Sequence, residues 1–455
     1  MSKYFGQAFA RAVALSTWLT LCGFAHAQSY EQSVAAYQEK DYATAFAGFQ
    51  KLAEEGHPES QYYLGRMFYF GWGVTEDKEK GNAWTLKAAE QGDPDAQYVM
   101  GLRLDAGFTK VSPTESSSAA AWYLKAAAQG HQMSQWMLAK MHDDGRGVAK
   151  DAQKAFGWYL KAAEQGDAGI QSEVADRYAA GNGVKQNWRS ACAWHERAAD
   201  GGQTYSMVMA GYCYSDASLG QMDQSKAIEW FKKAAENGSP FGQFDLANAF
   251  EFGEGVAKDE RKAFDLYRKA ADQNHADAQR RLGIFYEFGK GVKKDDREAV
   301  RWYQKSADQG NRFAQTNLGF KLMAGEGVAK DLSAAAASFR KSAEQNYNIG
   351  QHMLATMYED GLGVARDYEL AVMWYQKAAE LGYAESQNKL GVKLAEGNGT
   401  PKNMVEALKW FTIAAAAGND KAVDNRDKAE KSMGAAEVKR AQALAAAWIK
   451  KNKPS

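Results

Sequence analysis

The apolar positions along the chain follow a helical period in short blocks. In residues 239–274, Phe244, Ala247 and Phe250 recur at three-residue steps, which predicts one face of a first helix. A glycine-rich turn interrupts this pattern, and Asp259 then stands where the N-cap of a second helix is expected. Small and aromatic residues recur on one face of that second helix. The block therefore predicts two antiparallel helices joined by a turn.

The same block repeats along most of the chain. A glycine, or in two copies an asparagine, marks one fixed position, and every interval is 36 residues except one of 38. These markers are Gly56, Gly92, Gly130, Gly166, Gly202, Gly238, Asn274, Gly310, Asn346, Gly382 and Gly418. Self-similarity at this period is typical of a solenoid, in which each unit buries its face against its neighbours. Ten tandem units follow, and they predict an all-α solenoid of stacked helix pairs.

A Gly-x-Gly turn joins the two helices in most units, where glycine supplies the positive φ of a helix C-terminus. The second glycines of these turns are Gly73, Gly147, Gly183, Gly255, Gly291, Gly327, Gly363 and Gly399. An Asp or Asn follows each at four positions, which predicts the N-cap of the second helix. No predicted strand precedes the turns, so they do not indicate a phosphate-binding loop.

Tryptophan occupies one register of the second helix. The residues are Trp84, Trp122, Trp158, Trp194, Trp230, Trp302, Trp374 and Trp410, and the exceptions are Leu266 and Ser338. Such a stripe could form a ligand platform. Its constant register beside paired alanines instead favours packing between repeats.

Composition narrows the function classes. The chain has 455 residues, with 56 Lys and Arg against 56 Asp and Glu. This balance gives no basic excess for binding nucleic acid and no acidic tail for a basic partner. Outside the N-terminal segment the cysteines are Cys192 and Cys213, expected on adjacent helices of two successive units. They are close enough to pair in that arrangement, and two buried thiols are the alternative.

The N-terminus has the order of an export signal. Lys3 and Arg11 give a positive start, an apolar run extends to Phe24, and Ala25-His26-Ala27 is a small-residue cleavage site. The apolar run is too short for a comfortable membrane span. We therefore expect residues 1–27 to be a signal peptide and the mature chain to be periplasmic or secreted, without a transmembrane segment. A retained anchor is the alternative.

The repeat resembles a known family. The family's signature joins an Ala-Gln-x-x-Leu-Gly first helix, a Gly-x-Gly-Val turn with an Asp cap, and a second helix with Trp-Tyr and a closing Gly. The matching residues of one unit are Ala278, Gln279, Leu282, Gly283, Gly291, Val292, Asp295, Ala299, Trp302, Tyr303, Lys305 and Gly310. The pattern is similar to the Sel-one-like repeat (SLR), a branch of the tetratricopeptide (TPR) superfamily.

The resemblance implies a right-handed superhelix and a domain organisation. We expect an N-terminal TPR-like hairpin over residues 28–56, ten SLR units over residues 57–418 and C-terminal capping helices over residues 419–455. It also implies protein–protein scaffolding in the bacterial cell envelope, in the regulation of signalling or in envelope assembly. Two alternatives remain: a β-lactam-binding or hydrolysing enzyme of the cysteine-rich SLR type, and a structural subunit of an envelope or secretion complex. The chain lacks the cysteine pair in each repeat that the first alternative requires.

The sequence offers little sign of catalysis. His57, His131 and His275 share one register at the junction between units, which favours a common structural role over metal binding. The densest polar cluster, His142-Asp143-Asp144, is interpreted as a solvated helix end. No nucleophile motif occurs with its partners. We therefore expect no enzyme, no cofactor and no metal.

The resemblance also places a candidate binding groove. Aligning the small residue of the first helix, Gly65 and its counterparts, with the TPR pattern directs the positions three before and one after it into the concave face. These positions vary between units, as a recognition surface should, and the expected ligand is a peptide or protein segment. Phe241 and Phe313, six before the small residue, extend the same stripe. The predicted ligand-binding residues are Tyr62, Arg66, Tyr98, Trp136, Lys140, Tyr212, Phe241, Phe244, Arg280, Phe313, Phe320 and His352. The alternative is that several of these rings pack against the neighbouring first helix.

Overall fold

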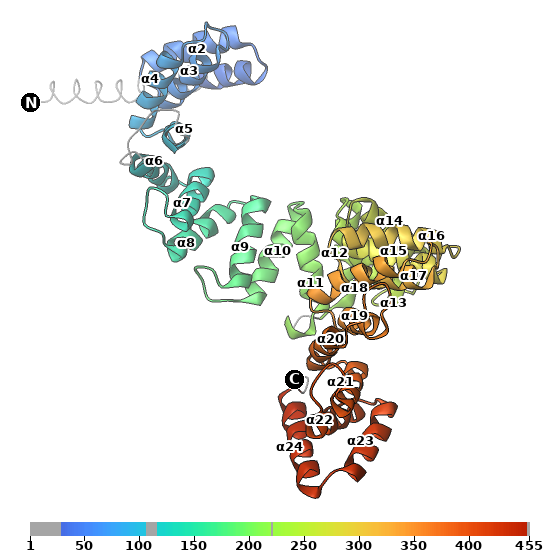
Figure 1. Cartoon of the computed structure of the whole chain (residues 1–455). Coiled ribbons are helices and arrows are strands. Elements are labelled where there is room, and N and C mark those ends of the chain that lie inside the picture. Colours follow the sequence, from blue (N-terminus) through green and yellow to red (C-terminus); the bar gives the residue numbers. More distant parts are fainter. Residues whose placement is uncertain (1–28, 106–115, 220–221, 453–455) are drawn as a thin grey trace, which may run out of the picture. The chain divides into compact units, whose positions relative to one another are not determined.

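The computed structural model describes residues 29–105, 116–219 and 222–452 (Figure 1). Within these ranges the secondary structure is helical and contains no β-strand. The prediction of an all-α helical repeat solenoid is confirmed, while the right-handed sense of the stack stays a prediction. The predicted signal segment, residues 1–27, lies outside the described residues.

Each repeat contributes a first and a second helix. The first helices are α3 (Pro58–Phe70), α5 (Pro94–Asp105), α7 (Gln132–Asp144), α9 (Ala168–Ala180), α11 (Thr204–Ser215), α13 (Pro240–Phe252), α15 (Ala276–Phe288), α17 (Arg312–Ala324), α19 (Asn348–Asp360) and α21 (Ala384–Glu396). The second helices are α4 (Lys78–Glu90), α6 (Ser116–Ala128), α8 (Ala152–Ala163), α10 (Trp188–Asp200), α12 (Gln224–Glu236), α14 (Glu260–Asp272), α16 (Asp296–Asp308), α18 (Leu332–Glu344), α20 (Tyr368–Glu380) and α22 (Met404–Ala416).

Further helices flank the repeats. A helix over residues 29–38 and α2 (Tyr42–Glu54) precede α3, and α23 (Asp420–Ser432) and α24 (Ala435–Lys451) follow α22. A short 3-10 turn, Ala217–Leu219, follows α11. The chain divides into two compact units, residues 1–213 and 214–455. Within each unit successive helices pack on one another, from α2 to α10 in the first and from α12 to α23 in the second.

The predicted caps hold the helices in register. Asp259, for example, accepts hydrogen bonds from the backbone N–H groups of Arg261 and Lys262, which would otherwise lack partners at the start of α14. His57, His131 and His275 cap first helices in the same way through their rings. The common structural position inferred for these histidines is confirmed.

The two glycines of each turn differ in surroundings. Gly325 and Gly327 both have positive φ, +79° and +72°. A Cβ atom on Gly327 would lie 2.1 Å from the backbone oxygen of Asp296 in the preceding repeat, whereas one on Gly325 would lie 3.1 Å from the side chain of Lys330. The second glycine therefore lets two repeats approach backbone to backbone, and the first only ends a helix.

The tryptophan register packs between repeats, as predicted. Trp194, Trp302 and Trp410 are buried within clusters of alanine and tyrosine side chains. A lysine or arginine lies over most of these rings, as Lys233 does over Trp230 at 3.9 Å. Three rings of the stripe are therefore core residues, and the other five are half-buried with a lysine over each ring.

A hollow marks the position where this register holds leucine. It has a volume of about 440 Å³ and is lined by residues of α12, α13 and α14, among them Ile228, Leu246, Phe250 and Leu266. Lys269 also lines it and stands three residues after Leu266, the spacing that Lys233 keeps from Trp230. Lys269 is therefore placed to cover an indole ring, but Leu266 provides none.

We expect Leu266→Trp to raise stability by about 1 kcal/mol, because the indole fills the hollow and lies under the ammonium group of Lys269. Thermal melting and urea unfolding followed by circular dichroism measure the change. Leu266→Ala is the control and should lower the melting temperature, because it enlarges the hollow. A lower melting temperature for Leu266→Trp would show that the ring does not fit there.

A glutamine of nine of the ten first helices links its repeat to the one before. In repeat 7 the Nε2 group of Gln279 donates to the backbone oxygen of Ala271 at 3.1 Å, and its Oε1 atom accepts from Gln309 at 2.7 Å. The glutamines that donate in this way are Gln61, Gln97, Gln135, Gln171, Gln243, Gln279, Gln315, Gln351 and Gln387. Each satisfies a buried helix-end carbonyl that would be costly to leave unpaired. We call this series the glutamine ladder.

The glutamine ladder is interrupted at the boundary between the fourth and fifth repeats. Met207 stands at the glutamine register of α11, so the fourth and fifth repeats lack the link. At this boundary Cys192 of α10 and Cys213 of α11 form a disulfide, with Cα atoms 5.8 Å apart. The predicted proximity of the two cysteines is confirmed, and the alternative of two thiols is not what the structure shows. A covalent bond joins the two repeats that the ladder does not.

Candidate functional site

The predicted groove residues lie on the first helices, and the structure gives them different degrees of exposure. Phe241, Tyr212 and Phe313 are the exposed rings, with 58%, 39% and 36% of their surface accessible. The other nine are half-buried: Tyr62, Arg66, Tyr98, Trp136, Lys140, Phe244, Arg280, Phe320 and His352. None is fully sealed in the core, so each retains surface that a ligand could contact.

Several half-buried rings also pack against the next first helix. The ring of Tyr98 lies 4.9 Å from that of His131, and Phe244 stacks on His275 at 4.7 Å. Both histidines cap the following first helix. Phe320 instead packs on Phe339 of its own repeat at 5.2 Å. These contacts agree with the packing alternative for those rings, while their role in binding stays a prediction.

Cations accompany the rings on this face. Lys140 lies 4.7 Å above the ring of Trp136, and Arg280 lies 5.5 Å from that of Phe313. The guanidinium group of Arg66 is within 6 Å of three rings, those of Tyr37, Tyr62 and Trp72. Such pairs keep an aromatic face at the surface beside a positive charge, which suits recognition of a peptide.

One part of the face is hollowed. An opening of about 480 Å³ lies between α3 and α5, a size usual for ligand pockets. Its lining consists of Tyr62, Arg66, Tyr69, Phe70, Val99, Leu102 and Arg103. The structure thus brings two predicted residues, Tyr62 and Arg66, together with Arg103, which the sequence analysis did not select.

Buried ion pairs between repeats are a second feature that the sequence analysis missed. Arg177 of α9 is 7% exposed and forms a bidentate pair with Asp143 of α7. Asp143 belongs to the cluster interpreted as a solvated helix end, and that interpretation is wrong for this residue. The signal in the sequence is a cation at a register that other repeats fill with Met67, Met141 or Met357.

The same register carries cations in two later repeats. Lys321 is 4% exposed and its ammonium group lies 2.8 Å from Glu287, while Lys393 lies 2.5 Å from Glu359. Burial alone would raise the pKa of Glu359, but hydrogen bonds from Lys393, Tyr375 and Lys389 hold it at about 2. Arg177, Lys321 and Lys393 are each matched by a carboxylate four residues after the small residue of the preceding first helix.

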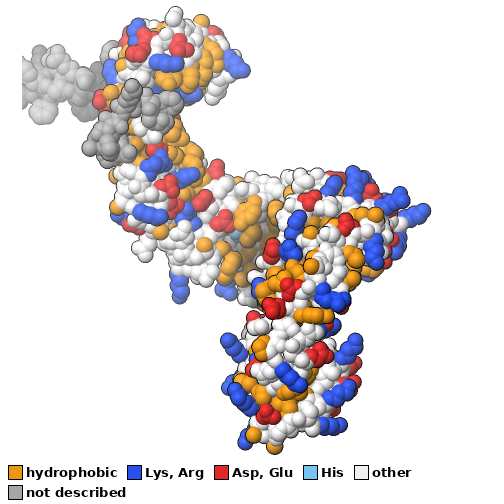
Figure 2. All heavy atoms as spheres, viewed as in Figure 1, with side chains coloured by type: hydrophobic (Ala, Val, Ile, Leu, Met, Phe, Trp, Pro, Cys, Tyr) orange, Lys and Arg blue, Asp and Glu red, His pale blue; other side chains and the backbone are white. Residues whose placement is uncertain are grey.

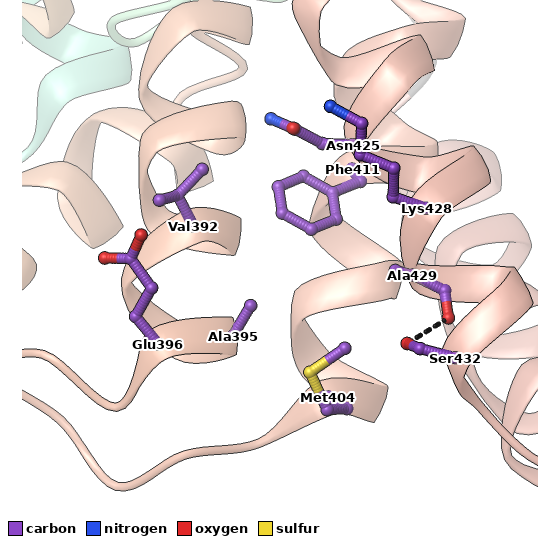
Figure 3. A pocket seen from close by; sticks show the side chains of 9 residues that line it. All are labelled: Val392, Ala395, Glu396, Met404, Phe411, Asn425, Lys428, Ala429 and Ser432. Carbon is purple, nitrogen blue, oxygen red and sulfur yellow. Dashed lines mark hydrogen bonds between the residues drawn. The ribbon is translucent and has the colours of Figure 1, made fainter.

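A smaller hollow of about 250 Å³ lies at the C-terminal end of the stack, between α21, α22 and α23. Figure 3 shows the ring of Phe411 facing this space, with Glu396 and Lys428 on opposite sides. The hydroxyl of Ser432 is committed to the backbone oxygen of Ala429 at 2.8 Å. The hollow brings together one ring and two separated charges, without a cluster of reactive groups.

One arrangement resembles the parts of a nucleophilic triad. The Oγ atom of Ser206 lies 3.2 Å from Nδ1 of His195, and Nε2 of His195 lies 3.6 Å from Asp176. Ser206 and His195 are buried, and burial lowers the pKa of the imidazole to about 4. Because the hydroxyl does not face solvent and the second distance exceeds a hydrogen bond, the arrangement is better explained as core packing.

The rest of the described chain adds no metal or membrane feature. Among residues 29–105, 116–219 and 222–452, no group of three His, Cys, Asp or Glu side chains could hold a metal ion. In these same ranges, no helix combines the length and apolarity needed to cross a membrane. Charges of both signs are interspersed with apolar side chains on the face shown in Figure 2. The face of the first helices is thus the strongest candidate for function.

Comparison with known proteins identifies solved structures that are similar to this chain. A search of the solved structures finds a protective antigen present in uropathogenic Escherichia coli strains and displaying an SLR fold, at 31% identity over 89% of this chain and 94% of that one, with a TM-score of 0.57. A Sel1 repeat protein from Oxalobacter formigenes matches at 30% identity over 68% of this chain and 88% of that one, with a TM-score of 0.60. A search of the curated proteins finds no match.

The family model described as Sel1 repeat matches ten successive segments. They are residues 58–93, 94–131, 132–167, 171–203, 204–239, 240–275, 276–311, 312–347, 349–383 and 384–419. These segments follow the helix pairs from α3 to α22, and together they make up most of the chain. The protein therefore belongs to the Sel1 repeat family.

Proposed function

We propose that this protein is an exported interaction scaffold of the bacterial cell envelope, which binds a peptide or protein segment along the face of its first helices. Repeats of this class suggest a protein–protein interaction scaffold. The finer parts of the proposal, export and binding on this face, rest on the leader-like N-terminus and on the exposed rings of α11, α13 and α17.

One contrast between registers carries the proposal. Two buried registers of the first helix keep their residue type: the small residue is Gly or Ala in all ten repeats, and the ladder residue is Gln in nine. The registers three before and one after the small residue vary in size and charge, from Trp136 and Lys140 in one repeat to Phe244 and Asn248 in another. Packing between identical repeats would favour identical residues, whereas a surface that reads a non-repeating ligand requires different ones.

The binding face can be tested on its exposed rings. We expect Phe241→Ala and Phe313→Ala each to weaken binding of a partner captured from the native envelope by about 2 kcal/mol if the ring is a hot spot. Isothermal titration of the purified partner measures the affinity, and melting reports the fold. Met373→Ala is the matched control, because Met373 of α20 is 38% exposed on a second helix. Equal affinity for all variants would reject this face.

Export makes a separate prediction. Cleavage after Ala27 leaves Gln28 as the first residue, so intact-mass measurement of the protein from its native source should give the mass of residues 28–455. The disulfide supports this part of the proposal, because such bonds persist in oxidising compartments. A mass that includes Met1 would contradict it.

A further inference from the structure

Three repeats show what a buried cation of the first helix requires. Arg177, Lys321 and Lys393 stand two residues after the small residue of their helices, and each pairs with a carboxylate of the preceding first helix. A buried charge without such a partner is strongly unfavourable. The protein thus has a consistent rule, in which the repeat before supplies the anion.

Arg103 departs from this rule. It stands at the same register of α5, but the preceding helix carries Tyr69 where the others carry Asp or Glu. The guanidinium group lies 4.9 Å from the ring of Tyr69, and its Nη1 atom is buried without a hydrogen-bond partner. Burial lowers the pKa of Arg103. In the part of the chain that the structure describes, no carboxylate forms an ion pair with Arg103.

The hollow between α3 and α5 is the place where an anion could reach it. Arg103 and Arg66 both line this space. Arg66 lies within 6 Å of three aromatic rings, and its charge also helps to lower the pKa of Asp95. The remaining lining is apolar or aromatic, and includes Phe70, which is 51% exposed. A ligand that fits must therefore carry one negative group beside apolar surface.

We infer that this hollow binds a partner segment in which a glutamate or aspartate side chain adjoins an apolar side chain, the carboxylate pairing with Arg103. The inference rests on the proposed function, which it deepens by naming the chemistry of the ligand. A guanidinium group presents two parallel N–H donors to a carboxylate, as Arg177 does to Asp143. The apolar rim disfavours inorganic phosphate, which has no apolar group to bury.

Synthetic peptides test the inference on the full mature chain. The probe is a fluorescein-labelled peptide with Leu-Glu-Phe between Gly-Ser flanks and a C-terminal amide, and the matched probe has Leu-Gln-Phe. Fluorescence anisotropy should show at least about tenfold tighter binding of the glutamate peptide, because a charged hydrogen-bonded pair is lost in the other. Equal binding of the two peptides, or binding of neither, overturns the inference.

A third peptide tests whether the site binds a side-chain carboxylate or the carboxylate at a chain end. It ends in Leu-Phe with a free C-terminal carboxylate and has no acidic side chain. If this probe binds and the glutamate peptide does not, the site reads chain ends and the inference is wrong. Tighter binding of the internal glutamate supports it.

Two substitutions assign the binding to Arg103. Arg103→Met places at this register a residue that three other repeats hold there, and it should reduce the affinity for the glutamate peptide to that for the glutamine peptide. Tyr69→Glu supplies the internal partner found at Glu287 and Glu359, so it should raise the melting temperature and abolish binding of the glutamate peptide. Unchanged affinity in Arg103→Met, or a lower melting temperature in Tyr69→Glu, contradicts the inference.

Failure of this inference can be distinguished from failure of the proposed function. Phe241 and Phe313 lie in the second compact unit, and the hollow lies in the first. If their alanine variants weaken partner binding while the peptides fail at Arg103, the scaffold function stands and this inference falls. If the peptides bind and those variants have no effect, only the extended binding face is rejected.

Discussion

Replacing Gly327 by alanine should lower the free energy of unfolding of the second unit by about 3 kcal/mol or more. This is the largest effect that we expect from a substitution that only adds atoms. The new methyl group would lie 2.1 Å from the backbone oxygen of Asp296 and 2.3 Å from its carbonyl carbon. A backbone atom cannot move away by changing rotamer, so the turn and α16 have to separate. Urea unfolding followed by circular dichroism measures the loss.

Two other glycines of the second unit separate this contact from backbone strain. Gly325 and Gly310 also have positive φ, but a Cβ atom would meet only the Lys330 side chain at 3.1 Å in the first case and nothing within 4 Å in the second. Alanine at either position should cost about 1–2 kcal/mol through the left-handed conformation alone. Equal losses at all three positions would show that the close approach of the repeats is not what requires Gly327.

Removing the disulfide should destabilise the first unit by about 3 kcal/mol. Cys192 and Cys213 are 21 residues apart, and the bond restricts the unfolded chain between them. Both side chains are buried, so alanine at both positions also loses some packing. The comparison of urea unfolding for the wild type and Cys192→Ala/Cys213→Ala, each with and without reductant, measures the effect.

The reductant serves as the internal control. Dithiothreitol should lower the stability of the wild type towards that of the double variant and leave the double variant unchanged. A wild type that is insensitive to full reduction would mean that the glutamine-free boundary is held by packing and not by the bond. Thiol labelling under denaturing conditions confirms that reduction is complete.

The features that could be predicted from the sequence are those that depend on residues of a single repeat. The cap at Asp259, the turn glycines and the register of Trp302 depend on residues a few positions apart, and at least eight copies of each reinforce the pattern. The cysteine pair was predictable as proximity, because the alternation of helices makes α10 and α11 neighbours in the chain. The chemical state of the two sulfur atoms required the structure.

The features that the sequence analysis missed are contacts between repeats that only some copies make. Arg177 and Asp143 are 34 residues apart, and neither belongs to the repeated signature. Arg103 stands out only when the residue that faces it in the preceding helix is known, because in the sequence alone it resembles the many arginines and lysines of the surface. Phe241 is 58% exposed, whereas Phe320 packs on Phe339, and the two rings stand at different registers, six before and one after the small residue of their helices.

The glutamine ladder has a consequence for how such a chain can change its length. Each link joins a side chain of one repeat to a main-chain carbonyl of the repeat before, so almost every boundary presents the same two halves. Loss of residues 276–311 would bring Gln315 to the carbonyl of Ala271, which Gln279 now occupies, and a duplication would insert one more identical joint. Unequal recombination in steps of 36 codons therefore lengthens or shortens the protein while keeping the glutamine joint, except at the disulfide, where that joint is absent.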